Sequence, residues 1–260
     1  MNEAIRENRF MPERGAHHLF LVWLMFVGLA AFAFFVSWHM EWLQLVFIWD
    51  SSRISWVIAI LFLVICVHAA ARAYVVSTEI TRVAIIGKRI ARLQPGGITI
   101  REGRLIAGGE PLPDSVVTGY LDDLFGSPHP VLNAGDPGAT NAELLEVVRH
   151  RLKGPNELGW YASDVMIRLG LLGTVVGFVL MLASVVGVTE FDAETMQGVL
   201  QKMGTGMGTA LYTTVAGLVC SMFTTAQYYL LDQGADEVVE AARHLAQARI
   251  AGLLRQGGDG

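Results

Sequence analysis

Four long apolar blocks constrain the fold of this chain more than any other feature. They cover residues 19–38, 54–71, 169–188 and 203–231, and none contains Asp, Glu, Lys or Arg. An α-helix rises about 1.5 Å per residue, so about 20 apolar residues cross the hydrocarbon layer of a bilayer. The chain is 53% hydrophobic and only 17% charged, whereas soluble domains carry about 25% charged residues. The sequence predicts an all-α integral membrane protein with four transmembrane helices.

The basic residues predict the orientation of these helices. The N-terminus, the stretch between the second and third blocks and the C-terminal tail are rich in Lys and Arg, whereas the other two loops carry only Arg53 and Lys202. Positive residues favour the cytoplasmic side, so both termini are expected there. The first block is too long for the apolar core of a signal peptide. Four tryptophans are expected at the outer interface: Trp38, Trp42, Trp49 and Trp56.

The blocks divide the chain into five predicted parts. These are a cytoplasmic N-terminus (1–18), a first transmembrane hairpin (19–77), a cytoplasmic segment (78–159), a second transmembrane hairpin (160–231) and a cytoplasmic C-terminal helix with its tail (232–260). Within them the patterns predict helical extensions at 75–93 and 235–254, a small β-hairpin around residues 98–106 and a helix at 141–153. Cys66 and Cys220 lie within spans, which indicates apolar packing and no disulfide.

Small residues form one face of the third block. Gly170, Gly173 and Gly177 are three and four residues apart, with Thr174 beside them. Residues at this spacing share one side of a helix, and small residues there let a second backbone approach closely. The third block is therefore expected to pack closely against another span along its glycine face.

The fourth block carries a matching face. Ala210, Thr214, Gly217 and Ser221 follow at intervals of four, three and four residues, and Thr213, Thr224 and Thr225 widen the polar surface. One interpretation is a polar path through the membrane. The simpler one is that each hydroxyl bonds its own backbone or a neighbouring helix. The residues alone do not decide between these two interpretations.

Asp, Glu, Lys, Arg and His are absent from the third and fourth blocks. A proton path needs a group near the bilayer centre that gains and loses a proton, so a second polypeptide is expected to supply a carboxylate. Asp164 and Arg168 lie at the inner end of the third span, where an interfacial ion pair is favoured over an entrance lining. His68 in the second span is better explained by a hydrogen bond between helices than by a relay.

These motifs resemble the MotA/TolQ/ExbB family of bacterial proton-channel proteins. The family pattern A-P-x-x-G-L-x-G-T-V-x-G is similar to residues 170–177, and A-L-x-x-T-x-x-G-L is similar to residues 210–218. The resemblance is strong over residues 165–231. One departure is Ile167, which stands where the family has proline; a proline there would kink the helix near the inner mouth.

The resemblance implies a mechanism. Such proteins form pentamers around two copies of a single-span MotB/TolR/ExbD-like partner whose span carries an Asp. Proton transfer at that Asp drives movement of the ring in the inner membrane. Thr174 and Thr214 match the pore-lining threonines, with Thr213 and Ser221 beside them. No cofactor is implied; the translocated ion is a proton, with sodium as the alternative.

Several alternatives stay open. The four-span order resembles the flagellar stator MotA more than three-span TolQ and ExbB, but gliding, outer-membrane energising and Zorya-type phage-defence motors fit equally. A non-conducting membrane scaffold would use the glycine faces for packing only. A solute transporter is disfavoured because no inverted repeat is visible. The chain has no catalytic motif or metal-ligand spacing, so it is not expected to be an enzyme or to bind a metal.

Overall fold

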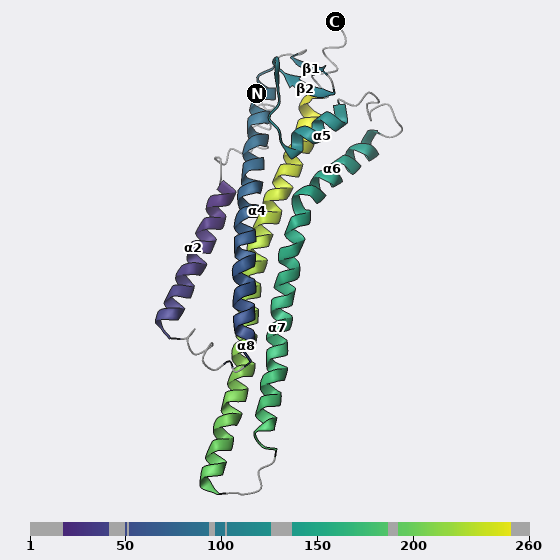
Figure 1. The fold of residues 1–260 in the computed structure, drawn as a ribbon. Helices are drawn as coiled ribbons and strands as arrows, with labels where there is room; N and C mark the ends of the chain where they lie inside the picture. The colour runs from purple at the N-terminus through teal and green to yellow at the C-terminus, as the bar shows by residue number, and fades with distance from the viewer. Residues whose placement is uncertain are drawn as a thin grey trace, which may run out of the picture. The chain divides into compact units, whose positions relative to one another are not determined.

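Four helices of the computed structural model are long and apolar enough to cross a membrane. The structure describes residues 18–41, 50, 52–93, 97–101, 103–125, 137–186 and 192–250. The helices that carry the four spans are α2 (His18–His39), α4 (Ile54–Ala91), α7 (Glu157–Ala183) and α8 (Ala193–His244) (Figure 1). The prediction of an all-α membrane protein with four spans is confirmed.

The ends of the helices differ from the predicted blocks. α7 ends at Ala183, before the predicted Val188, because Ser184 N–H bonds Met181 O three residues back and tightens the last turn. α8 begins at Ala193, ten residues before the predicted span. There the Asp192 carboxylate accepts a hydrogen bond from Thr195 N–H at 3.0 Å and caps the helix. The same helix then continues into the predicted C-terminal helix without interruption.

The contacts within the chain divide it into two compact units. The first consists of residues 1–22, 72–156 and 230–260, and the second of residues 23–71 and 157–229. Each unit is built from segments far apart in the sequence, and α4 and α8 contribute to both. The units are considered separately below.

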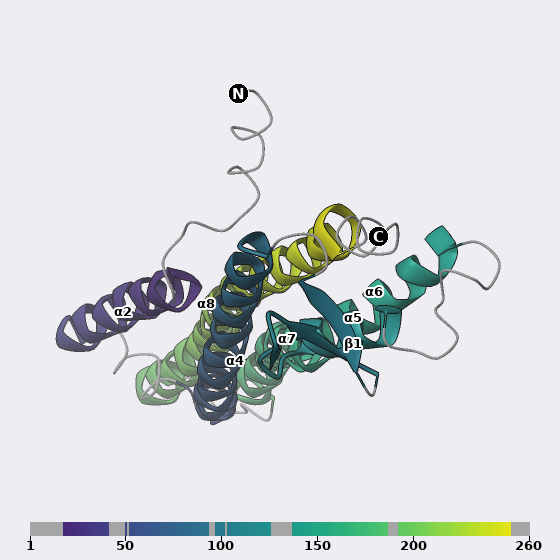
Figure 2. The same ribbon diagram turned by 90° about the horizontal axis from the view of Figure 1, so that it is seen from above.

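The first unit contains a small antiparallel sheet. Its strands are β1 (Ile98–Arg101), β2 (Arg104–Ala107) and β3 (Glu110–Pro111), in the order β1-β2-β3, and Ile98 pairs with Ala107. The hairpin was predicted from sequence, but the two-residue β3 was not. The turn positions Gly103, Gly108 and Gly109 have φ of 75°, 64° and 85°, a region that glycine enters without steric cost. Figure 2 shows the sheet and α5 (Val116–Phe125) from above, and β2 contacts this helix.

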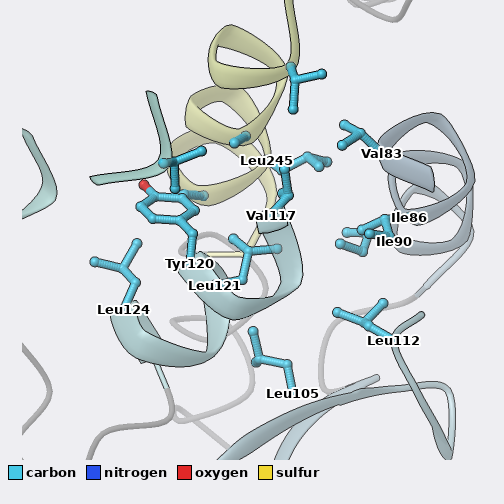
Figure 3. Close-up of a cluster of buried hydrophobic side chains, with 14 of the residues drawn as sticks. Val83, Ile86, Ile90, Leu105, Leu112, Val117, Tyr120, Leu121, Leu124 and Leu245 are labelled. Carbon is cyan, nitrogen blue, oxygen red and sulfur yellow. The ribbon is translucent and has the colours of Figure 1, made fainter. Parts of the chain in front are cut away.

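A hydrophobic core joins the elements of the first unit. Figure 3 shows side chains from α4, β2, the segment between β3 and α5, α5 itself and the π-helical turn Leu245–Ile250 meeting in one cluster: Val83, Ile86, Ile90, Leu105, Leu112, Val117, Tyr120, Leu121, Leu124 and Leu245. The sequence-predicted apolar face of the C-terminal helix, including Val238, Ala242 and Ala246, is buried in this cluster. This packing holds the first unit together.

Polar contacts tie the helices of the first unit to one another. A 3₁₀ turn at Gly154–Asn156, labelled η2, follows α6 (Pro137–Lys153) and precedes α7. At this corner Arg72 donates to Leu152 O at 2.5 Å and to Asn156 Oδ1 at 3.1 Å, while Asn156 Nδ2 donates to Asp232 Oδ1 at 2.7 Å. Asn156 is only 1% exposed, so it links α4 and α8 from a buried position.

Burial raises the pKa values of two ionisable groups of α5. Burial raises the pKa of Tyr120 to about 12, and its hydroxyl donates a hydrogen bond to Asn141 Oδ1. Burial also raises the pKa of Asp122, whose Oδ1 accepts a hydrogen bond from Leu105 N–H at 2.8 Å, and that bond and the charge of Arg104 partly counteract the shift. Both groups therefore favour their neutral form more than they would in water.

The second unit consists of α2, the first part of α4, α7 and most of α8. Trp23 of α2 is buried, and Phe26 of α2 lies 5.9 Å from Phe223 of α8, measured between ring centroids. Large apolar side chains remain exposed on these helices, as expected for a surface that faces lipid. Of the predicted outer tryptophans, Trp38 and Trp56 are about half exposed; Trp42 and Trp49 lie outside the described residues.

Candidate ion pathway between α7 and α8

The glycine face of α7 lies directly against α8. A Cβ built on Gly177 would lie 2.5 Å from Ala210 N and 2.6 Å from Gly206 O, and one built on Gly217 would lie 2.6 Å from Met166 O. Distances this short leave no room for a methyl group, because the neighbours are backbone atoms. Gly206, which sequence reasoning did not single out, takes part in the same contact: its Cβ would lie 2.7 Å from Met181 N.

The threonines near this contact occupy three different environments. Thr213 is fully buried against Gly173, and its hydroxyl donates to Thr209 O at 2.8 Å. Thr214 is partly exposed and donates to Gly170 O on α7 at 3.1 Å and to Ala210 O at 3.0 Å. Thr174 is partly exposed and donates to Leu171 O of its own helix at 2.6 Å. Thr214 is therefore the threonine among these whose hydroxyl bridges the two helices.

A cluster of three hydroxyls lies further along the same helix pair. Ser163 Oγ is 2.8 Å from Ser221 Oγ and 2.8 Å from Thr225 Oγ1, and it also donates to Ser221 O at 3.3 Å. Ser163 and Ser221 are buried. Ser221 was predicted to belong to the pathway, but its partner Ser163 was missed because it precedes the apolar block. The spacing could have identified Ser163, because it lies seven residues before Gly170 and therefore on the glycine face of the helix.

The charges at the start of α7 form a surface ion pair. Arg168 Nη2 lies 2.5 Å from Asp164 Oδ2, with the two side chains 70% and 49% exposed. They are four residues, about one helical turn, apart on α7, and both side chains are exposed. The predicted ion pair between these residues is therefore present, and its position at the membrane surface stays a prediction.

His68 of α4 bonds a tyrosine of α8. Its Nδ1 lies 2.6 Å from Tyr228 Oη, which is the bond between helices that the sequence favoured. Tyr228 is fully buried, and a Cβ on Gly159 of α7 would lie 2.0 Å from its Cζ. Gly159 thus gives the ring the space to reach α4. Nearby, Gln227 Nε2 donates to Cys66 Sγ at 3.5 Å, and both Cys66 and Cys220 are free thiols.

Metal-ligand side chains do not gather in the part of the chain that the structure describes: no group of three His, Cys, Asp or Glu residues is placed to hold an ion. The polar groups of the α7–α8 pair are instead hydroxyls and backbone carbonyls. These can bond water or a neutral carboxyl group but have no fixed charge.

These features define a multi-pass membrane protein built around a closely packed pair of helices with hydroxyls along it. Residues 144–244 match the model of the MotA/TolQ/ExbB proton channel family. That range contains both motifs and all of α7, so the resemblance is confirmed over residues 144–244. Comparison with curated proteins and with solved structures found no match.

Proposed function

We propose that this chain is the channel-forming subunit of an ion-driven motor complex in the bacterial inner membrane. Copies of the chain form a homo-oligomeric ring, a pentamer by family resemblance, around two copies of a single-span MotB/TolR/ExbD-like partner. Both termini and segment 78–159 lie in the cytoplasm. The ring couples ion flow to mechanical work, and the chain needs no cofactor.

The observation that carries this proposal is the placement of Thr214. Its hydroxyl bridges α8 and α7 at Gly170 O while the side chain stays partly exposed. It lies in a stretch of α8, residues 203–231, that has no ionisable side chain except three tyrosines and one cysteine. A hydroxyl with spare hydrogen-bonding capacity in such a surface suits a carboxyl group brought by another chain. Thr174 on α7 offers a second hydroxyl.

The energy for the work comes from the ion gradient. Each elementary charge that crosses the membrane releases about 2.3 kcal/mol per 100 mV. The proton is the favoured ion because a carboxyl group on the partner would carry it by protonation; sodium is the alternative. These residues do not identify the driven process. The candidates are flagellar, gliding, outer-membrane energising and Zorya-type defence motors.

A flux measurement tests the proposal. Vesicles that hold the complex are given a membrane potential, and proton uptake is compared between wild type, Thr214→Val and a partner without its membrane Asp. We expect uptake in wild type and its loss in both variants. A well-assembled wild-type complex without potential-driven uptake would support the non-conducting scaffold. Uptake that is unchanged in Thr214→Val would exclude Thr214 from the path.

A further inference from the structure

β1 is an edge strand of the sheet in the first unit. The strand order is β1-β2-β3, so β1 has a neighbouring strand on one side only. The edge of a sheet carries a row of main-chain N–H and C=O groups that a further strand can bond. Among the residues that the structure describes, no backbone hydrogen bond is made on the outer side of β1. These residues therefore leave one edge of the sheet open for pairing.

The hydrogen-bond pattern of the hairpin shows which groups point outward. Opposite residues of an antiparallel pair alternate between bonded and non-bonded positions. Gly108 N–H donates to Gly97 O at 3.0 Å and marks a bonded position. Ile100 lies three residues further along, opposite Leu105, and so at a non-bonded position. The Leu105 N–H agrees with this, because it donates away from β1 to Asp122 Oδ1 at 2.8 Å. The N–H and C=O of Ile100 therefore point to the open edge.

The Ile100 side chain gives this edge an apolar contact. Alternate residues of a strand point to the same face, so Ile100 shares a face with Ile98, which belongs to the hydrophobic core and is 7% exposed. Ile100 itself is 45% exposed. Apolar and β-branched side chains on neighbouring strands stabilise each other, so an added strand would cover Ile100 best with a residue of this kind.

The opposite face of the hairpin is positively charged. Arg101 and Arg104 lie directly opposite each other in the register, and both side chains are exposed. Like charges in this arrangement are destabilising. The ion pairs of the described residues involve other arginines; Glu102, between these two in the sequence, lies outside the described residues. A carboxylate brought by an added strand would relieve the repulsion.

We propose that the open edge of β1 binds an extended segment of a partner protein as a fourth strand, and that this segment alternates acidic and apolar residues. Main-chain hydrogen bonds to Ile100 supply the pairing, as in other cases of strand addition. An apolar residue packs beside Ile100, and an acidic neighbour meets Arg101 on the other face. The inference goes beyond the proposed function, because β1 belongs to the first unit and the α7–α8 contact to the second.

A synthetic peptide tests the edge. A fluorescent peptide of alternating glutamate and valine is titrated into the full-length protein in detergent, and binding is followed by fluorescence anisotropy. Methylation of the valine amides and methylation of the glutamate amides block opposite edges of the peptide. We expect saturable binding of the parent peptide, with one methylated form at least about tenfold weaker and the other within about twofold, the scale of lost main-chain hydrogen bonds.

Matched variants test the protein side. Ile100→Pro removes the outward N–H and leaves the bonds to β2 in place, and proline is tolerated in edge strands in this orientation. Ile100→Val keeps the N–H and is the control. Binding should weaken at least about tenfold in Ile100→Pro and less than about twofold in Ile100→Val. The double change of Arg101→Glu with Arg104→Glu should reverse the preference, from this peptide to one of alternating lysine and valine.

Hydrogen exchange reads the pairing directly, because bound peptide should slow exchange at residues 98–101. Equal binding by Ile100→Pro and Ile100→Val, equal binding of both methylated peptides, or no binding to wild type at about 1 mM peptide overturns the inference. An assembly that becomes smaller in Ile100→Pro without any peptide binding assigns the edge to contacts between copies and also overturns it. If Ile100→Pro does not fold, the methylated peptides decide, since they leave the protein unchanged. Proton uptake remains the separate test of the proposed function.

Discussion

The hydroxyl of Thr214 on α8 donates a hydrogen bond to the carbonyl oxygen of Gly170 on α7 at 3.1 Å. This bond exists because Gly170 and Gly217 allow the two backbones to approach: a Cβ on Gly217 would lie 3.0 Å from Gly170 Cα. The close packing of α7 and α8 and the position of the Thr214 hydroxyl therefore depend on each other. A change in either should affect the other.

Thr214→Val should weaken the helix pair slightly and abolish conduction. Valine has nearly the same shape but cannot donate to Gly170 O, and a hydrogen bond between membrane helices contributes about 0.6 kcal/mol on average. Thermal unfolding in detergent would measure the first effect and proton uptake the second. Thr205→Val is the control, because Thr205 donates only to Gln201 O of its own helix at 3.1 Å. Equal uptake in both variants would contradict the pore-lining role.

Gly177→Ala should separate the two helices. The new methyl group would meet Ala210 N at 2.5 Å and Gly206 O at 2.6 Å, and backbone atoms cannot rotate away. Overpacking of this kind costs about 1–3 kcal/mol, so the melting temperature in detergent should fall. Gly204→Ala on α8 is the matched control, since nothing lies within 4 Å of its Cβ position. A Gly177→Ala variant as stable as this control would contradict the packing described here.

Asn156→Ala should destabilise the corner between α6 and α7. The change removes one hydrogen-bond partner from Arg72 and one from Asp232. Because Asn156 is 1% exposed, water cannot replace it freely, and we expect a loss of about 1–3 kcal/mol. Limited proteolysis of the α6 region would detect the loosened corner. Gln233→Ala on the exposed side of α8 should show no such increase in cleavage.

Arg168→Gln should leave stability nearly unchanged. The ion pair with Asp164 is exposed, and exposed pairs of this spacing contribute about 0.3–0.5 kcal/mol. Proton uptake distinguishes the two interpretations of the pair. Unchanged uptake supports an ion pair at the membrane surface, whereas a strong loss would assign the charges to the mouth of the pathway.

The stability of the first unit should fall between pH 10 and pH 12. Tyr120 has a pKa of about 12 in the folded chain against an ordinary value of 10.0. The unfolded chain therefore loses this proton first, so the contribution of the group is complete below pH 10 and is lost as the pH rises through 12. Absorbance of tyrosinate should show one tyrosine that titrates late, and Tyr120→Phe should lack that step. A late step that persists in Tyr120→Phe would contradict the assignment.

Hydropathy predicted the spans because the cost of placing charge in lipid dominates every other local preference. The ends of the helices were predicted less well, since they depend on single caps such as Asp192 and on the turn at Ser184. The two-residue β3 gives no periodic signal at all. Single interactions worth about 1 kcal/mol decide where a helix ends, and the sequence pattern does not reveal them.

The candidate site was predicted in outline from the glycine spacing, but its partners were not. Which side chain meets Gly170 or Gly173 depends on how α7 and α8 are rotated and shifted against each other. That arrangement placed Thr213 inside the contact and left Thr214 partly exposed, although the two are neighbours in sequence. Ser163 was missed because it precedes the apolar block and because its partners, Ser221 and Thr225, lie about sixty residues away in the sequence.

The backbone contact at Gly177, Gly206 and Gly217 has a mechanical consequence. Helices whose main chains touch at several points cannot slide past each other without first moving apart, which the rest of the contact opposes. α7 and the membrane part of α8 should therefore move as a single rigid body. If ion transfer displaces this hairpin, both helices must tilt or turn together, and the bending must occur outside the glycine contact.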